Sequence, residues 1–180
     1  MLATGASTRC SGENGSNDHA GQKETLCNRP SHTITPSLTL KNSREAIEFY
    51  KKAFGAKVLD VLPAPDGKRT MHAMIQIGDS FLMMGDEMPD QGCQSAESLG
   101  ASPISLYVYV PNVDQVFKQA VAAGATATMP VADMFWGDRA GNLKDPFGYS
   151  WMIATHIRDL TQEEIQEGAQ AFFASLPQRK

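Results

Sequence analysis

The chain has 180 residues, of which 42% are hydrophobic and 20% are charged, and this composition suits one globular domain with a sizeable core. The formal net charge of −4 argues against a nucleic-acid-binding protein, which would present a basic face. The sequence contains no run of about 18 apolar residues, the length that a membrane-spanning helix needs. The three cysteines, Cys10, Cys27 and Cys93, are odd in number and include no CxxC pair. A disulfide framework is therefore not expected, and the cytoplasm is the predicted location.

Residues 1–31 are predicted to be a disordered N-terminal extension. Residues 11–24 are mostly Ser, Gly, Asn, Asp, Glu, Gln and Lys, with almost nothing to bury. The segment also lacks the continuous apolar stretch of a secretory signal. We expect the folded domain at residues 32–158, followed by a C-terminal helix and tail at residues 159–180.

The first half of the domain predicts the element order βαβββ. Apolar and hydroxyl residues alternate at residues 34–40, the period-2 pattern of a half-buried strand. A turn with a helix N-cap follows at residues 41–43, and apolar residues recur at helical spacing up to Gly55. Three further strands are expected at residues 58–62, 70–77 and 80–84, with turns between them.

The same order restarts after a polar linker at residues 85–102. It predicts a strand at residues 104–110, a helix from about residue 113 to Gly124, and strands near residues 127–129, 142–144 and 150–154. The two halves match at an offset of 70 residues, as in Asn42 and Asn112, or Ser80 and Ser150. The predicted fold class is α+β: two tandem βαβββ modules, at about residues 33–85 and 103–156, forming curved mixed sheets around a central cavity. Thr161 and Glu164 then form a capping box that begins the C-terminal helix.

Five segments resemble a known family. They are EFYKKAFGA (residues 48–56), MHA (71–73), IGDS (77–80), FWGDR (135–139) and DPFGYSW (145–151). Together they resemble the vicinal-oxygen-chelate superfamily of glyoxalases, bleomycin-resistance proteins and dioxygenases. Within it they resemble the PhnB-like subgroup, which also carries a 3-demethylubiquinone methyltransferase-like label. The resemblance covers about residues 33–164 and implies paired βαβββ modules and a homodimer.

The resemblance does not imply one reaction, because the superfamily includes metal-dependent enzymes as well as metal-free antibiotic-binding proteins. In metal-dependent members, each module's first strand can present a His ligand and each last strand a Glu ligand. The corresponding positions here are Thr35, Ser105, Leu82 and Met152, and none is a good ligand for the usual divalent ions. We therefore predict no metal site and expect no cofactor, while a divalent metal at another place stays open.

Strand alternation predicts which side chains line the cavity. Hydroxyls, two phenols and thioethers face inward and suit a neutral or aromatic organic ligand. The alternative is that these side chains only fill a channel or a dimer seam. The candidate ligand-binding residues are Thr35, Ser37, Ser105, Tyr107, Tyr109, Met84, Trp136, Arg139, Ser150 and Met152.

Two of these candidates and one histidine have alternative interpretations. Trp136 could stack on a planar ligand while Arg139 binds an anionic group. Alternatively, Trp136 fills the core and Arg139 pairs with Asp138 or Asp145. His72 is the candidate catalytic residue, as a general base or a ligand of an unusual metal, or else a structural histidine.

The sequence thus leaves two principal functions open. One is a metal-independent protein that binds a small molecule. The other is a lyase, isomerase or dioxygenase that uses His72 with Asp86, Glu87 or His156 in a relocated site. A methyltransferase is disfavoured, because no Gly-rich strand-turn-helix for S-adenosylmethionine is visible. Whether the protein is an enzyme is not decided by the sequence.

Overall fold

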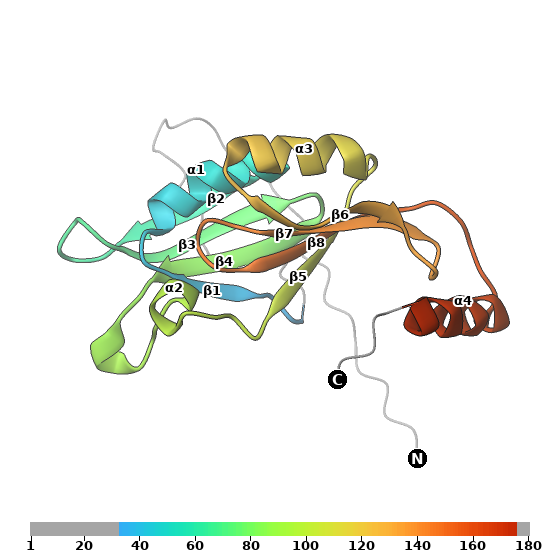
Figure 1. Ribbon diagram of the computed structural model, residues 1–180. Coiled ribbons are helices and arrows are strands. Elements are labelled where there is room, and N and C mark those ends of the chain that lie inside the picture. The colour runs from blue at the N-terminus through green and yellow to red at the C-terminus, as the bar shows by residue number, and fades with distance from the viewer. Residues whose placement is uncertain (1–32, 176–180) are drawn as a thin grey trace, which may run out of the picture. The chain divides into compact units, whose positions relative to one another are not determined.

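The computed structural model describes residues 33–175, so the predicted disordered extension at residues 1–31 lies outside the described residues. Each half of the domain has the predicted βαβββ order (Figure 1). The first half contains β1 (Ser37–Leu40), α1 (Ser43–Phe54), β2 (Lys57–Pro63), β3 (Thr70–Ile77) and β4 (Ser80–Asp86). The second contains β5 (Ser105–Tyr109), α3 (Val113–Ala123), β6 (Thr126–Asp133), β7 (Asp138–Lys144) and β8 (Ser150–His156).

Three short or terminal helices complete the described chain. The linker between the modules contains a 3-10 turn at Pro89–Gln91 and α2 at Ala96–Leu99. The C-terminal helix α4 covers Gln162–Ser175. Its predicted capping box is present, because the Glu164 amide donates to Thr161 Oγ1 while the Thr161 amide donates to the Glu164 carboxylate. Within residues 33–175, no helix combines the length and the apolar character that crossing a membrane requires.

The strands form two four-stranded mixed sheets, in the orders β1-β4-β3-β2 and β5-β8-β7-β6. In each sheet the first strand runs parallel to the last strand of its own module, and the remaining pairs are antiparallel. Helices α1 and α3 cover the same side of the two sheets (Figure 1). We call the opposite side of each sheet its open face. The predicted α+β fold of two βαβββ modules is confirmed.

The two covering helices begin in the same way, as the repeat predicts. The side chain of Asn42 accepts a hydrogen bond from the Glu45 amide, and that of Asn112 accepts one from the Gln115 amide. These caps satisfy amides that no helical carbonyl can reach. Helix α1 ends at Gly55, which has a positive φ of 66°.

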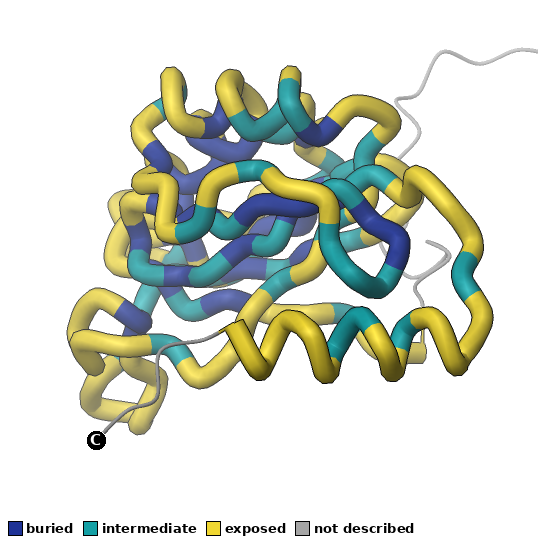
Figure 2. The backbone as a smooth tube through the Cα atoms, turned by 45° about the vertical axis from the view of Figure 1, so that its right-hand side comes forward, coloured by how far each residue is buried: buried dark blue, intermediate teal, exposed yellow. Residues whose placement is uncertain are grey.

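The core lies between the helices and the sheets, and its aromatic part joins the two modules. Tyr50 and Phe54 of α1 pack against Trp151 of β8, with ring centroids 5.4 and 4.7 Å from the indole. Phe147, in the turn before β8, contacts the rings of Phe49 and Tyr50. Figure 2 shows the buried backbone concentrated in the strands and on the inner sides of α1 and α3, whereas α4 is exposed or half-buried.

The strand register corrects one expectation about side-chain direction. Ser37 lies opposite Met83 in the first sheet, and Tyr107 lies opposite Met152 in the second. The modules are therefore offset by 70 residues at their first strands but by 69 at their last strands. Since a shift of one residue turns a side chain to the other face, Met84 faces the helices, where it is 1% exposed, and not the cavity as predicted.

Several boundaries differ from the predicted ones. The first strand begins at Ser37 rather than at residue 34, and Ile34 is exposed. The preceding Pro36 has no amide hydrogen, but its carbonyl accepts a hydrogen bond from Met83. Strands β6 and β7 are longer than predicted, because polar residues such as Asp133 and Asp138 continue the pairing beyond the short apolar runs.

Candidate ligand-binding site

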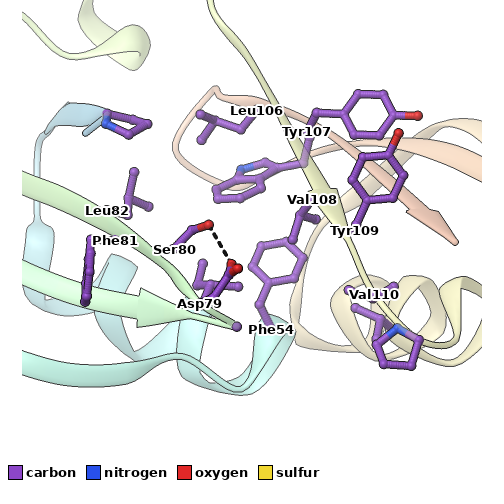
Figure 3. Close-up of a pocket in the computed structure, with 16 residues that line it drawn as sticks. Phe54, Asp79, Ser80, Phe81, Leu82, Leu106, Tyr107, Val108, Tyr109 and Val110 are labelled. Atoms are coloured by element: carbon purple, nitrogen blue, oxygen red, sulfur yellow. Dashed lines mark hydrogen bonds between the residues drawn. The ribbon is translucent and has the colours of Figure 1, made fainter. Parts of the chain in front are cut away.

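A cleft of about 570 Å³ lies between the two modules. Residues 106–111, from β5 and the turn after it, form one wall, and residues 77–82, at the β3–β4 hairpin, form the other. The cleft is also lined by the apolar side chains of Phe54, which Figure 3 labels, and of Val116 and Trp151. Because most of these side chains are hydrocarbon or aromatic, the cleft suits an apolar or aromatic organic ligand.

The polar groups of the cleft are few. Among the described residues that line it, Asp79 is the only charged one, and the Ser80 hydroxyl donates a hydrogen bond of 3.0 Å to the Asp79 carboxylate. Tyr107 and Tyr109 contribute two further polar side chains. Figure 3 shows the side chain of Leu106 and the two tyrosine rings on opposite sides of β5. The tyrosine pair therefore belongs both to the cleft and to the open face of the second sheet.

The two tyrosines converge on a buried carboxylate. The hydroxyls of Tyr107 and Tyr109 donate to Asp138 Oδ2 at 3.0 and 2.9 Å, and the Trp136 indole nitrogen donates to the same oxygen at 3.0 Å. His156 Nδ1 lies 2.9 Å from Asp138 Oδ1. The Asp138 side chain is 3% exposed. This cluster of five side chains is called the Asp138 cluster below.

The hydrogen bonds of the Asp138 cluster keep the carboxylate ionised and the phenols protonated. Burial by itself raises the pKa of Asp138, but the hydrogen bonds from His156, Tyr109, Tyr107 and Trp136 outweigh it and hold the pKa below its usual value. Burial, together with the hydrogen bond to Asp138, raises the pKa of Tyr107. The hydrogen bond to Asp138 also raises the pKa of Tyr109. Asp138 is thus a fixed negative charge behind two neutral phenols.

His156 links the cluster to the segment that leads into α4. Its Nδ1 faces Asp138 and its Nε2 lies 3.0 Å from Asp159 Oδ1. Hydrogen bonds to Asp138 and then to Asp159 raise the pKa of His156. The imidazole of His156 therefore lies between two carboxylates, and the exposed Arg158 precedes Asp159 in the chain.

A tight turn between β6 and β7 positions Trp136 and Asp138. Gly137 has a φ of 97°, which favours glycine, and its carbonyl accepts hydrogen bonds from the amides of Ile157 and Arg158. The Met134 amide donates to the Asp138 carbonyl at 2.7 Å. The turn is therefore held against the end of β8, next to His156.

The structure brings most of the second module's predicted ligand residues to one face. Ser105, Tyr107, Ser150 and Met152 share the open face, because Ser105 lies opposite Ser150 and Tyr107 opposite Met152. Ser37 lies on the open face of the first sheet, while Thr35 precedes β1. Whether these residues bind a ligand stays a prediction.

In the FWGDR segment, Trp136 and Arg139 have hydrogen-bond and ion-pair partners that differ from the expected ones. Trp136 is half-buried and donates its indole N–H to Asp138, so it is not a deep core residue, and whether its ring stacks on a ligand stays a prediction. Arg139 pairs with Asp114 at the start of α3 and with Asp133 of β6, and not with Asp138 or Asp145. Since neighbouring strand residues point to opposite faces, Arg139 lies away from the Asp138 cluster.

The residues proposed to assist His72 do not gather around it. His72 is half-buried on the open face of the first sheet, on the same side as Met83. Asp86 faces the helices. Its carboxylate accepts hydrogen bonds of 2.7 Å from the Ser43 amide and 2.8 Å from the Thr70 amide. Glu87 accepts the amide of Ser95 and the hydroxyl of Ser98. Both carboxylates therefore hold helices and loops in place.

The residues at the superfamily's metal positions do not fit a divalent ion. Thr35 and Ser105 offer hydroxyls, and the residue that matches Met152 in the first sheet is Met83 rather than Leu82. Thioethers and hydroxyls are poor ligands for the hard or borderline ions of this superfamily. Among residues 33–175, no three or more His, Cys, Asp or Glu side chains form a group that could hold a metal.

The sequence pattern does not reveal the Asp138 cluster. It suggests Asp138 only as a partner of Arg139, whereas the real partners of Asp138 come from β5, β8 and the preceding turn. Trp136 is the partner close to it in sequence, and the other three lie 18 to 31 residues away. The alternation of Tyr107 and Tyr109 on β5 is the one local signal that points to this face.

Two βαβββ modules with an apolar cleft between them define an α+β protein with a candidate small-molecule site. Comparison with known proteins assigns its family. A model of the glyoxalase/bleomycin resistance protein/dioxygenase superfamily matches residues 29–153. The chain belongs to this superfamily. The uncharacterized protein Rv0887c of Mycobacterium tuberculosis is 36% identical over 152 residues, which cover 82% of this chain and 88% of that protein.

Solved structures agree with this assignment. Protein PA1353 from Pseudomonas aeruginosa is 26% identical, with a TM-score of 0.58 over 71% of this chain and 100% of that one. A PhnB protein from Bacillus cereus, whose name refers to 3-demethylubiquinone-9 3-methyltransferase, has the same fold, with 21% identity and a TM-score of 0.55 over 69% of this chain and 99% of that one. The predicted likeness to the superfamily is confirmed, and the PhnB protein shares its fold.

Proposed function

We propose that the protein binds a small organic molecule in the cleft between its modules and does so without a metal ion. The observation that carries the proposal is the composition of the cleft: about 570 Å³ walled by Phe54, Val116, Trp151 and the apolar residues of β5. Burying an apolar or aromatic ligand there would be favoured by about 25 cal/mol per Å² of apolar surface removed from water. The volume also falls within the usual range for small-molecule sites.

The donor atoms near the cleft support a metal-independent mode of binding. The superfamily's ligand positions carry hydroxyls and thioethers, and the buried carboxylate bonded to the cleft tyrosines, Asp138, is occupied by four hydrogen bonds from protein donors. A carboxylate offers about four acceptor positions. Asp138 is therefore poorly placed to coordinate an ion in addition.

Tryptophan fluorescence offers a direct test, because the chain has two tryptophans and only Trp151 lines the cleft. The variant Trp136→Phe leaves Trp151 as the single donor of energy to the neutral probe N-phenyl-1-naphthylamine. We expect probe emission to rise and Trp151 emission to fall, to the same extent with EDTA as with added Mn²⁺. Elemental analysis of unchelated protein should find no stoichiometric divalent metal.

A pair of matched variants locates the probe. Val108→Phe adds volume inside the cleft and should weaken probe binding, whereas Val121→Phe adds the same volume on the exposed side of α3 and should not. Binding that requires the metal ion, or that Val108→Phe leaves unchanged, would contradict the proposal. The homodimer and the cytoplasmic location inferred from the sequence remain predictions that gel filtration and fractionation can check.

A further inference from the structure

The hydroxyl protons of the two cleft tyrosines are used in hydrogen bonds within the protein. The hydroxyls of Tyr107 and Tyr109 both donate to Asp138 Oδ2, and they lie on rings whose centroids are 5.0 Å apart. A hydroxyl that donates its single proton can offer a ligand only its lone pairs. Both tyrosine side chains are accessible, with exposed fractions of 46% and 63%. The pair therefore presents acceptor oxygens and aromatic faces to whatever lies beside β5.

The charges behind these oxygens favour a positive ligand. Asp138 is ionised and 3% exposed, so a ligand meets its charge through the phenols and not directly. Asp159 adds a second carboxylate through His156, but it is fully exposed and follows Arg158 in the chain, so the buried charge of Asp138 is the one that lies directly behind the phenols. Arg139, the nearest cation along the chain, lies on the other face and is paired with two carboxylates of its own. Hydrogen bonds in which one partner is charged are about twice as strong as neutral ones.

We propose that Tyr107 and Tyr109 form the polar end of the ligand site and select an organic ammonium group attached to an apolar body. This inference rests on the proposed function, since the apolar body would occupy the cleft that the same two tyrosines line. The ammonium would donate to the phenol oxygens and contact the rings by cation–π attraction. Asp138 acts as a positioning residue that fixes both hydroxyls.

A matched series of probes separates the two proposals. Each probe has one 2-naphthyl group with a hexyl chain that ends in an ammonium, a methyl or a carboxylate, and each is scored by displacement of N-phenyl-1-naphthylamine. We expect the ammonium probe to bind at least about tenfold more tightly than the carboxylate probe. A methyl probe that displaces the dye, with ammonium and carboxylate probes of equal affinity, would overturn the inference but leave the proposed function standing. Failure of all three probes to displace a dye bound in the cleft would overturn the inference alone, whereas a protein that does not bind the dye would overturn both.

Variants then assign the preference to the tyrosines. Tyr109→Phe and Tyr107→Phe, made singly, should each reduce the ammonium-to-carboxylate ratio at least about threefold while leaving the methyl probe unaffected, because the ring stays and the hydroxyl, with its acceptor oxygen and its hydrogen bond to Asp138, is removed. Asp79→Asn removes the carboxylate charge at the hairpin wall of the cleft and tests the competing explanation, whereas Glu48→Gln removes an exposed carboxylate outside the cleft and is the control that should preserve the ratio. A ratio that survives both tyrosine variants and disappears in Asp79→Asn would assign the selectivity to the hairpin and overturn the inference. Unchanged affinity for the methyl probe shows that each variant is folded.

Discussion

The Tyr50 hydroxyl donates a hydrogen bond of 2.8 Å to the carboxylate of Asp145, 95 residues further along the chain. This contact joins the first module's helix α1 to the turn before the second module's last strand. The same carboxylate accepts the Trp151 indole at 2.9 Å and the amides of Phe147 and Tyr149. Asp145 is 4% exposed, so all of these bonds are shielded from water. The aromatic floor of the cleft is therefore held by one buried carboxylate that both modules share.

Removing the Tyr50 hydroxyl should destabilise the domain measurably. Tyr50→Phe leaves the ring in place but deprives Asp145 of one donor, and a buried acceptor that loses its partner costs about 1–3 kcal/mol. Urea denaturation should show that loss in the free energy of unfolding. Tyr109→Phe is the comparison: it also removes a donor from a buried carboxylate, Asp138, but Tyr109 is 63% exposed, so water can replace its hydroxyl and the effect should be smaller. Equal stability of Tyr50→Phe and the unmodified protein would show that the contact contributes nothing.

The stability of the domain should depend on pH through His156. Hydrogen bonds to Asp138 and Asp159 raise the pKa of His156 in the folded state above its ordinary value of 6.5. A histidine with a raised folded pKa contributes stability that is fully present below the unfolded pKa and is lost as the pH rises through the folded pKa. The melting temperature should therefore fall as the pH increases from about 6 upward.

The variant His156→Gln tests this assignment. It retains hydrogen-bonding capacity but cannot be protonated, so the fall in melting temperature over that pH range should become shallower than in the unmodified protein. An NMR titration of the His156 ring should give a pKa above the ordinary value of 6.5. A pKa at or below that value, or an identical pH slope in the variant, would contradict the contribution of the Asp138–His156 pair.

The turn that carries Trp136 and Asp138 should not tolerate a side chain at Gly137. A Cβ there would collide with the carbonyl oxygen of Arg158, and the positive φ is unfavourable for any L-residue. Gly137→Ala should therefore cost about 2–4 kcal/mol, from left-handed strain and overpacking combined. Gly78→Ala is the matched control, because Gly78 also has a positive φ but a Cβ there would have open space within 4 Å. Thermal denaturation should show the larger loss at Gly137, and equal losses would mean that the collision relaxes freely.

Arg139 should matter for α3 rather than for ligand binding. Its guanidinium bridges Asp114 and Asp133 at 2.9 and 2.8 Å, on the face away from the Asp138 cluster. Arg139→Gln should change the dissociation constant of N-phenyl-1-naphthylamine less than about twofold, and its effect on melting temperature should shrink as salt is added. A large loss of probe affinity would instead support the sequence-based interpretation that Arg139 contacts the ligand.

The fold is predictable because its signals are local and occur twice. Period-2 alternation at β1 and β5, the Asn caps of α1 and α3 and the capping box of α4 each depend on residues a few positions apart. Because the pattern repeats, each module supports the interpretation of the other. Side-chain directions on β4 are less secure, since one residue of difference between the modules reverses the face that Met84 occupies.

The sequence by itself determined the two βαβββ modules and the face of β5 that carries Tyr107 and Tyr109. Only the tertiary structure decided that both hydroxyls meet Asp138, that His156 and Trp136 share that carboxylate, and that Arg139 turns to the other face. The reason is physical: alternation and capping depend on neighbours along the chain, whereas these hydrogen bonds depend on strand register and on one glycine turn that bring distant residues into contact.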